Sequence, residues 1–189
     1  MNTKSKHTME QDRSRFPKRI VRSAAATLGM ILLAMAFLMA VPRANAAITV
    51  STSDQDFMLA AAQGGMTEVK LGELAATNGM RDDVKKFGQM MVKDHSAIND
   101  DLKALAAQKV VTLPDSLDAK HQGMVDKLTG LTGSDFDNAY IAGMVKGHKK
   151  DAKAFKAEAA ETQDTDIKSF LDKSIPVVEA HLKCITAMK

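Results

Sequence analysis

The chain has few residues that form cross-links or large aromatic cores. Its 189 residues include one cysteine, no tryptophan, one tyrosine and four prolines. The single Cys184 cannot form an internal disulfide, and without a Cys-x-x-Cys-His motif covalently attached c-type haem is excluded. A packed free thiol is the simpler interpretation of Cys184, and an intermolecular disulfide is the alternative.

The sequence also lacks the short motifs of common enzyme classes. It contains no nucleophile elbow, P-loop or dinucleotide-binding fingerprint. Ser96 directly follows His95, so on a helix the two side chains face different directions and form no catalytic dyad. A non-enzyme is therefore favoured over an enzyme that acts on an organic substrate.

Residues 1–46 have the composition of a secretory signal peptide. Lysine and arginine are frequent between residues 4 and 22, residues 24–41 are uncharged, and Ala44-Asn45-Ala46 offers small residues where signal peptidase reads them. We predict cleavage after Ala46 and export to the periplasm or beyond. The alternative is an inner-membrane anchor formed by residues 24–41, a run just long enough to span a bilayer.

Removal of this leader reverses the sign of the net charge. The whole chain has 26 Lys and Arg and 23 Asp and Glu residues, and residues 1–46 carry eight and two of these, so the remainder has a net charge of −3. The basic character belongs to the leader and gives no reason to expect nucleic-acid binding. We also expect no stable membrane insertion after cleavage, and the sequence sets no oligomeric state.

The mature chain reads as one all-α domain. Alanine, lysine, leucine and methionine are abundant, and all favour helices. After a short tail at 47–53, residues 54–188 are predicted to form a four-helix bundle with a short extra helix between the second and third long helices. The first helix is expected to run from a Ser53 cap to about residue 77, and the second from 81 to 108. A short connecting helix is expected at 116–128, followed by the third long helix at 135–162 after a Ser134 cap. The last helix is expected to begin at an Asp164 cap and contains Pro176.

Each long helix carries one ionisable residue on an otherwise apolar seam. Heptad spacing puts Glu68, His95, His148 and His181 on seams whose other members are mostly aliphatic or small. An unpaired buried polar group costs roughly 1–3 kcal/mol, so four such residues call for one common explanation. Three of them lie near helix midpoints, and in an up-and-down bundle the midpoints share one level.

Two hypotheses explain this pattern. Three imidazoles and one carboxylate suit a zinc, copper or iron ion, and nearby acids can orient the imidazoles or complete the ligand set: Asp94, Asp151 and Glu179. The alternative is a non-catalytic stress or interaction module in which the same side chains form a purely structural hydrogen-bonded network. Paired Glu-x-x-His motifs are absent from the mature chain, which disfavours a ferritin-type di-iron oxidase.

Two further features bear on a metal. Thioether and imidazole together suit copper(I), and Met91 and Met144 each lie one seam step from a histidine, although methionine more commonly just fills helical cores. His121 falls on an apolar face of the connecting helix, where it either extends the constellation or shows that such histidines are frequent here.

Several stretches together resemble one bacterial family. They are residues 65–72, the run from Met91 to Ser96, residues 131–140, and Pro176 followed by His181. This ordered set is similar to the domain-of-unknown-function 4142 family of exported proteins, and the resemblance covers residues 54–188. It implies a ferritin-like fold and an exported location. It implies no activity, and the outer-membrane label often given to the family gains no support from this chain, which shows no alternating barrel strands.

Overall fold

The computed structural model describes residues 50–189, which form five helices and, apart from an isolated bridge between Gly79 and Gly133, no β-structure. The predicted leader, its cleavage site and the alternative anchor lie outside the described residues. No helix within residues 50–189 combines the length and hydropathy needed to cross a bilayer. The five helices are α1 (Thr52–Asn78), α2 (Asp82–Gln108), α3 (Ala119–Thr129), α4 (Gly133–Glu161) and α5 (Thr165–Thr186).

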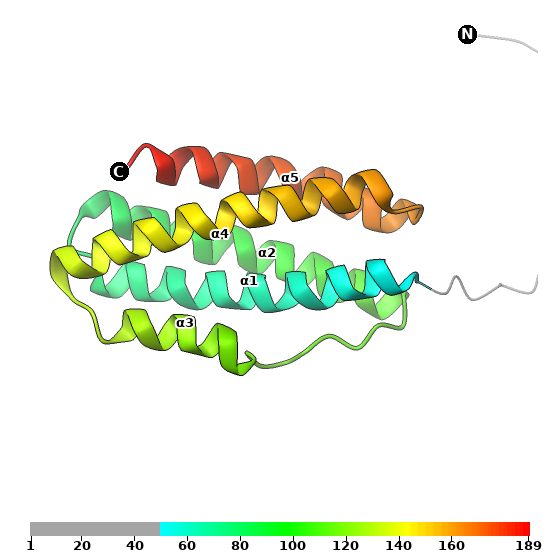
Figure 1. The fold of residues 1–189 in the computed structure, drawn as a ribbon, viewed down its shortest axis with the longest axis horizontal. Helices are drawn as coiled ribbons and strands as arrows, with labels where there is room; N and C mark the ends of the chain where they lie inside the picture. Colours follow the sequence, from blue (N-terminus) through cyan, green and yellow to red (C-terminus); the bar gives the residue numbers. More distant parts are fainter. Residues whose placement is uncertain (1–49) are drawn as a thin grey trace, which may run out of the picture. The chain divides into compact units, whose positions relative to one another are not determined.

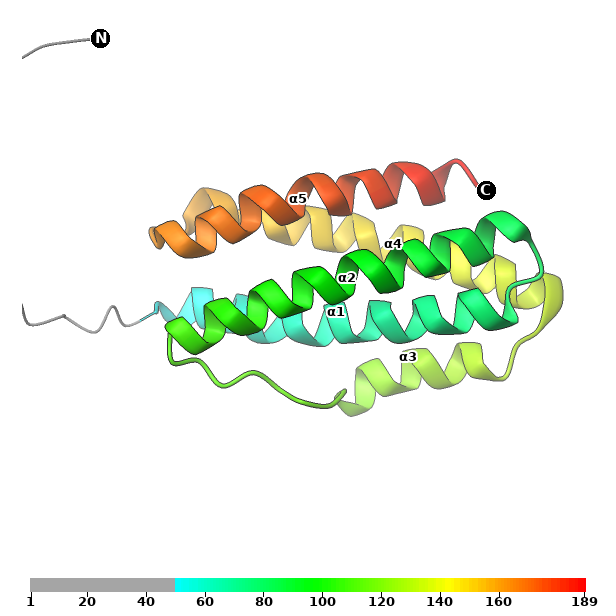
Figure 2. The same ribbon diagram turned by 180° about the vertical axis from the view of Figure 1, so that it is seen from behind.

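The four long helices form the bundle, and α3 packs outside it along α1 (Figures 1 and 2). Short turns make α1 antiparallel to α2, and α4 antiparallel to α5. Residues 109–132 run along the length of the bundle, so α2 and α4 point the same way. One long crossover is typical of ferritin-like bundles. The predicted all-α fold, a ferritin-like four-helix bundle with an extra connecting helix, is confirmed.

The helix starts differ in part from the predicted ones. Ser51, not Ser53, caps α1, because its side chain accepts a hydrogen bond from the backbone of Asp54 at 3.0 Å. Both serines offer the same capping chemistry, and the packing of Val50 against the core selects the earlier one. Asp164 caps α5 as predicted, and α5 continues through Pro176 as one helix.

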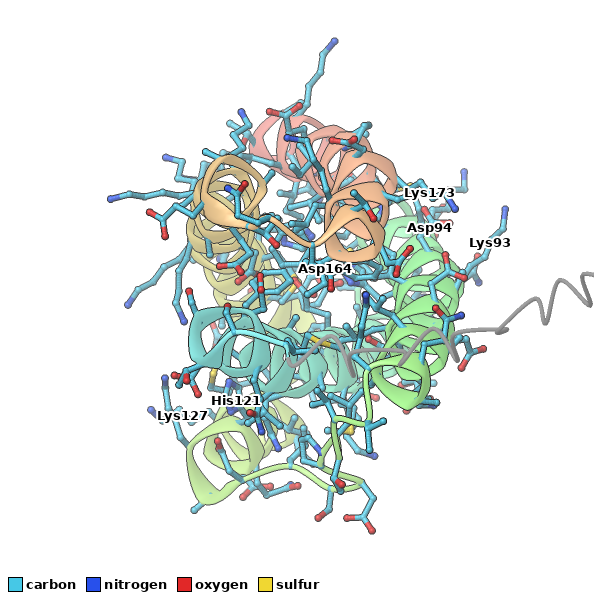
Figure 3. All side chains as sticks on the ribbon, turned by 90° about the vertical axis from the view of Figure 1, so that its right-hand side faces the viewer. Lys93, Asp94, His121, Lys127, Asp164 and Lys173 are labelled. Atoms are coloured by element: carbon cyan, nitrogen blue, oxygen red, sulfur yellow. The ribbon has the colours of Figure 1, made fainter. Side chains whose placement is uncertain are left out.

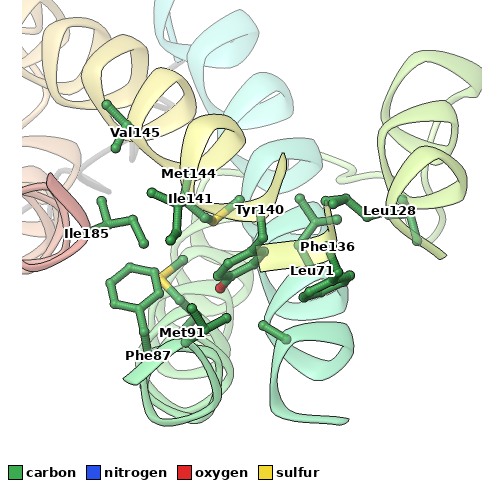
Figure 4. Close-up of a cluster of buried hydrophobic side chains, with 13 residues drawn as sticks. Leu71, Phe87, Met91, Leu128, Phe136, Tyr140, Ile141, Met144, Val145 and Ile185 are labelled. Carbon is green, nitrogen blue, oxygen red and sulfur yellow. The ribbon is translucent and has the colours of Figure 1, made fainter. Parts of the chain in front are cut away.

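The core consists of two hydrophobic clusters separated by a polar layer. One cluster, shown in Figure 4, contains large side chains from all the bundle helices, among them Leu71, Phe87, Tyr140, Met144 and Ile185. The other, towards the opposite end, includes Met58, Leu102, Phe155, Ile167 and Leu171. Between the two clusters each long helix contributes one buried ionisable residue to the polar layer: Glu68, His95, His148 and His181. The four residues therefore lie at one level of the bundle.

Glycine permits the close approach of α1 and α2 that brings this level together. A Cβ atom on Gly88 would lie 2.6 Å from the carbonyl oxygen of Gly72 and 2.8 Å from Ala75 Cβ. The backbones touch at this crossing, so neither position accommodates a side chain without a shift of the helices. This contact between α1 and α2 lies within two helical turns of His95 and Glu68. It therefore sets how closely these two side chains approach each other.

Candidate metal centre

The three predicted histidines meet inside the bundle. His148 is fully buried, His181 is 1 % exposed and His95 is 3 % exposed. The centroids of their imidazole rings lie 5.1 Å apart for His95 and His181, 5.5 Å for His148 and His181, and 5.6 Å for His95 and His148. Three different helices, α2, α4 and α5, therefore each contribute one imidazole to a compact triangle.

Two of the imidazoles belong to a hydrogen-bonded chain with a carboxylate at each end. Glu68 Oε2 lies 2.9 Å from His95 Nδ1, and Asp94 Oδ2 lies 3.0 Å from His181 Nε2. A carboxylate only accepts hydrogen bonds, so each of these ring nitrogens donates its proton outward. The remaining nitrogens, His95 Nε2 and His181 Nδ1, face each other at 3.2 Å. Each of these two nitrogens then carries a lone pair. A single cation between them, either a proton or a metal ion, would satisfy both.

The third imidazole also has one protonated nitrogen and one nitrogen with a lone pair. His148 Nδ1 lies 3.1 Å from the backbone oxygen of Met144, which can only accept, so Nδ1 carries the proton. His148 Nε2 therefore holds a lone pair, and this buried atom has no hydrogen-bond partner. An unpaired buried acceptor is costly unless it binds something, which is the feature expected of a ligand atom.

One nitrogen from each ring lies within 4.8 Å of the other two. Nitrogens bound at ~2.0–2.1 Å to one tetrahedral ion are separated by about 3.3–3.4 Å. The 3.2 Å contact between His95 and His181 already has that spacing. Metal-ligating histidines usually donate their second ring N–H to a carboxylate or a backbone carbonyl, and all three do so here. The donor set fits a transition-metal ion.

The predicted acids occupy different places. Glu68 is 8 % exposed and faces the Nδ1 atoms of His95 and His148, the latter at 3.5 Å. Asp94 contacts His181 at the surface between α2 and α5 (Figure 3). Asp151 lies close enough to Glu68 for the charge of Glu68 to act on its carboxyl group. Glu179 is exposed and pairs with Lys156, so it is not brought to the imidazoles.

His121 lies apart from the triangle. It sits between α1 and α3, outside the four-helix bundle (Figure 3), and its Nδ1 hydrogen-bonds Asp118, the N-cap of α3, at 2.8 Å. The open question about this residue is thus resolved in favour of a histidine that packs on the side of the bundle.

Burial controls the protonation of the site. Burial lowers the pKa of His148, and the charge of Glu68 only partly opposes this. Burial also lowers the pKa of His181, against the hydrogen bond that His181 donates to Asp94. For Glu68 burial opposes ionisation, but the charge and hydrogen bond of His95 outweigh it and lower its pKa. Burial and the charge of Glu68 raise the pKa of Asp151 to about 7. Burial thus favours the neutral imidazole for His148 and His181, while Glu68 stays ionised.

The walls of the site include two aromatic residues that the sequence did not single out, Phe87 and Tyr140. The Phe87 ring lies 6.1 Å from His181 and 6.5 Å from His148, measured between centroids. Met91 and Met144 belong to the same cluster as Phe87 (Figure 4). Tyr140 is fully buried, its hydroxyl has no partner, and burial together with the charge of Glu68 raises its pKa. The sequence pointed to Met91 and Met144 as neighbours of the histidines, but not to Phe87 or Tyr140.

The family of the chain follows from a comparison with protein-family models. The model described as "Domain of unknown function (DUF4142)" matches residues 39–188, so the chain belongs to that family. This confirms the resemblance seen in the sequence. A comparison with curated proteins gives no match.

Several solved structures share the fold. CopM in its Cu(I)-bound form matches with a TM-score of 0.60 and 17 % identity, over 71 % of this chain and 94 % of CopM. CopM in its Cu(II)-bound form gives a TM-score of 0.61 and 18 % identity, with the same coverage. A DUF305 fragment from Deinococcus radiodurans gives 0.65 and 7 % identity, over 74 % of this chain and 96 % of the fragment. At these identities the likeness concerns the fold.

Proposed function

We propose that this member of the DUF4142 family is an exported protein that binds one transition-metal ion in the core of its bundle. His95 Nε2, His148 Nε2 and His181 Nδ1 are the proposed ligands. The observation that carries the proposal is the convergence of three buried imidazoles, with one nitrogen of each ring within 4.8 Å of the other two and with every ring hydrogen-bonded to a carboxylate or a backbone carbonyl.

The acids have supporting roles in this proposal. Glu68 and Asp94 accept the outward-facing N–H groups of His95 and His181, which fixes the tautomer and increases the basicity of the ligand nitrogens. Glu68 thus acts as an orienting group rather than as the fourth ligand, because its oxygens face the Nδ1 atoms. Asp151 supports Glu68, and no role remains for the exposed Glu179.

Copper is the first candidate among zinc, copper and iron. The site is enclosed by apolar side chains, and two thioethers lie in the same cluster, which suits copper(I). The CopM structures of the same fold hold Cu(I), Cu(II) or silver. An ion held this deeply exchanges slowly, so we propose sequestration or transfer of the metal rather than catalysis.

The alternative is a structural network that sets helix register. In the hydrogen-bonded series Asp94–His181–His95–Glu68, every ring nitrogen has a partner if one proton lies between the two imidazoles. That state, however, leaves His148 Nε2 without a partner. The orphaned nitrogen is the specific reason to favour the metal.

A metal titration distinguishes the two. We expect the purified, untagged protein to bind one equivalent of copper or zinc and to unfold at a higher temperature when loaded. The double variant His95→Ala, His148→Ala should lose both effects, whereas His121→Ala, which changes a histidine outside the site, should keep them. Binding of no ion, or equal binding by the double variant, would leave the structural network as the function of these residues.

A further inference from the structure

A second polar cluster lies at the end of the bundle where α1 begins and α4 ends. Asp54, in the first turn of α1, is 4 % exposed, and Glu158, in the last turn of α4, is 7 % exposed. Asp54 lies one turn before Phe57 and Glu158 one turn after Phe155, and the rings of these two phenylalanines meet between the antiparallel helices α1 and α4, which brings the two carboxyl groups to the same level. A hydrogen bond between two carboxyl groups requires a proton on one of them. One oxygen of each, Asp54 Oδ1 and Glu158 Oε1, is buried without another partner.

The surroundings supply no positive charge to this pair. Within residues 50–189, neither acid forms an ion pair with a lysine, arginine or histidine. The nearby Lys109 at the end of α2 is held by Asp164 and Asp166 of the α5 start, at 2.6 and 2.7 Å. On α4, Glu161 adds a like charge. The remaining partners are hydroxyls: Ser51 Oγ donates to Asp54 at 2.7 Å, and Thr162 also hydrogen-bonds Asp54.

We propose that Asp54 and Glu158 form a proton-dependent latch. One shared proton ties the first turn of α1 to the last turn of α4, and loss of that proton places two negative charges in contact inside a poorly hydrated site. The latch closes over the second hydrophobic cluster, where Phe57 of α1 and Phe155 of α4 meet edge to face at 5.2 Å between centroids. Its opening loosens this end of the bundle.

The pKa values of the two acids indicate which of them holds the proton. Burial and the hydrogen bond with Asp54 raise the pKa of Glu158 to about 7. For Asp54 burial opposes ionisation, but hydrogen bonds from Thr162 and Ser51 outweigh it and keep its pKa below the ordinary value. Glu158 is therefore the protonated partner. Its stabilising effect is complete below pH 4.5, the ordinary pKa of a glutamate, and is lost as the pH rises through about 7.

Melting temperatures at two pH values test the latch. Compared with the unchanged protein, Glu158→Gln should melt at nearly the same temperature at pH 5 and several degrees higher at pH 8, because Gln keeps the donor and cannot ionise. Titration of the core histidines is common to both proteins and cancels in the difference. The matched control Glu73→Gln, which changes an exposed acid about five turns further along α1, should show no such divergence. Equal pH dependence of Glu158→Gln and the unchanged protein would overturn the proposal.

Carbon-13 NMR of the unchanged protein gives an answer even if a variant fails to fold. The Glu158 carboxyl resonance should titrate with a midpoint near 7, and the backbone amides of Ser51–Asp56 should shift with the same midpoint while those of α3 do not. A Glu158 midpoint near the ordinary glutamate value, or unmoved amides at the start of α1, would show that the pair holds no latching proton.

Discussion

At the scale of single residues, the tautomer of each histidine follows from one neighbour. Carboxylates fix His95 and His181, and a backbone carbonyl one turn earlier fixes His148. The spacing of the sequence indicated that these residues share a level, because heptad seams depend only on position. It did not indicate which ring nitrogen faces inward, since that depends on contacts between different helices. For the same reason the sequence could not distinguish a ligand role for Glu68 from the orienting role that we propose.

Val110 is the most strained residue in the described part of the chain. It is the only non-glycine there with a positive φ, at 58°, and it is 92 % exposed. It occupies the position after the α2 C-cap at which glycine is normally found, and the amides of Val110 and Val111 bond back to the carbonyls of Ala107 and Ala106. A left-handed conformation costs an L-residue roughly 1–2 kcal/mol, and a β-branched side chain is especially disfavoured there.

Replacement of this residue tests the strain. We expect Val110→Gly to increase the free energy of unfolding by about 1 kcal/mol, since it relieves the strain and loses almost no packing. Urea denaturation followed by circular dichroism measures this. Val110→Ala serves as the control and should gain less, because it keeps the Cβ atom. A loss of stability in Val110→Gly would contradict the assignment of strain.

At the scale of helices, types and approximate bounds were predictable because local patterns decide them. The Asp164 cap and the α2 end at residue 108 were identified, whereas the α1 cap was displaced by two residues. Asp137 shows the limit of local reasoning. It lies near the start of α4, yet its carboxylate accepts hydrogen bonds from the backbone N–H groups of Met80 and Arg81 at 3.0 and 2.9 Å and so caps α2. Nothing in the local sequence encodes that partner.

The close contact of α1 and α2 at Gly72 and Gly88 gives a prediction about how the helices pack. Gly88→Ala should destabilise the protein by roughly 1–3 kcal/mol, because the new methyl group would overlap the backbone of α1. Gly143→Ala is the matched control: Gly143 lies inside α4 with open space around its Cα, so alanine should be neutral or stabilising there. Thermal unfolding of both variants measures the difference. Equal effects of the two substitutions would mean that the helices are not held in contact at Gly88.

At the scale of the molecule, a polar layer divides the core of one bundle. Hydrophobic clusters lie on both sides of it, and the crossover at 109–132 makes the four helices meet with their ionisable residues aligned. The sequence predicted the bundle and the convergence. It did not predict the path of the crossover or the walls formed by Phe87 and Tyr140, because these arise from packing between elements distant in the chain.

The proposed metal site is tested most directly by X-ray absorption spectroscopy of the copper-loaded protein. The account predicts a first shell of three nitrogens at ~2.0 Å with the multiple scattering of imidazole, and the loss of one imidazole in His148→Leu. A first shell made only of oxygen, or one that is unchanged in His148→Leu, would contradict it.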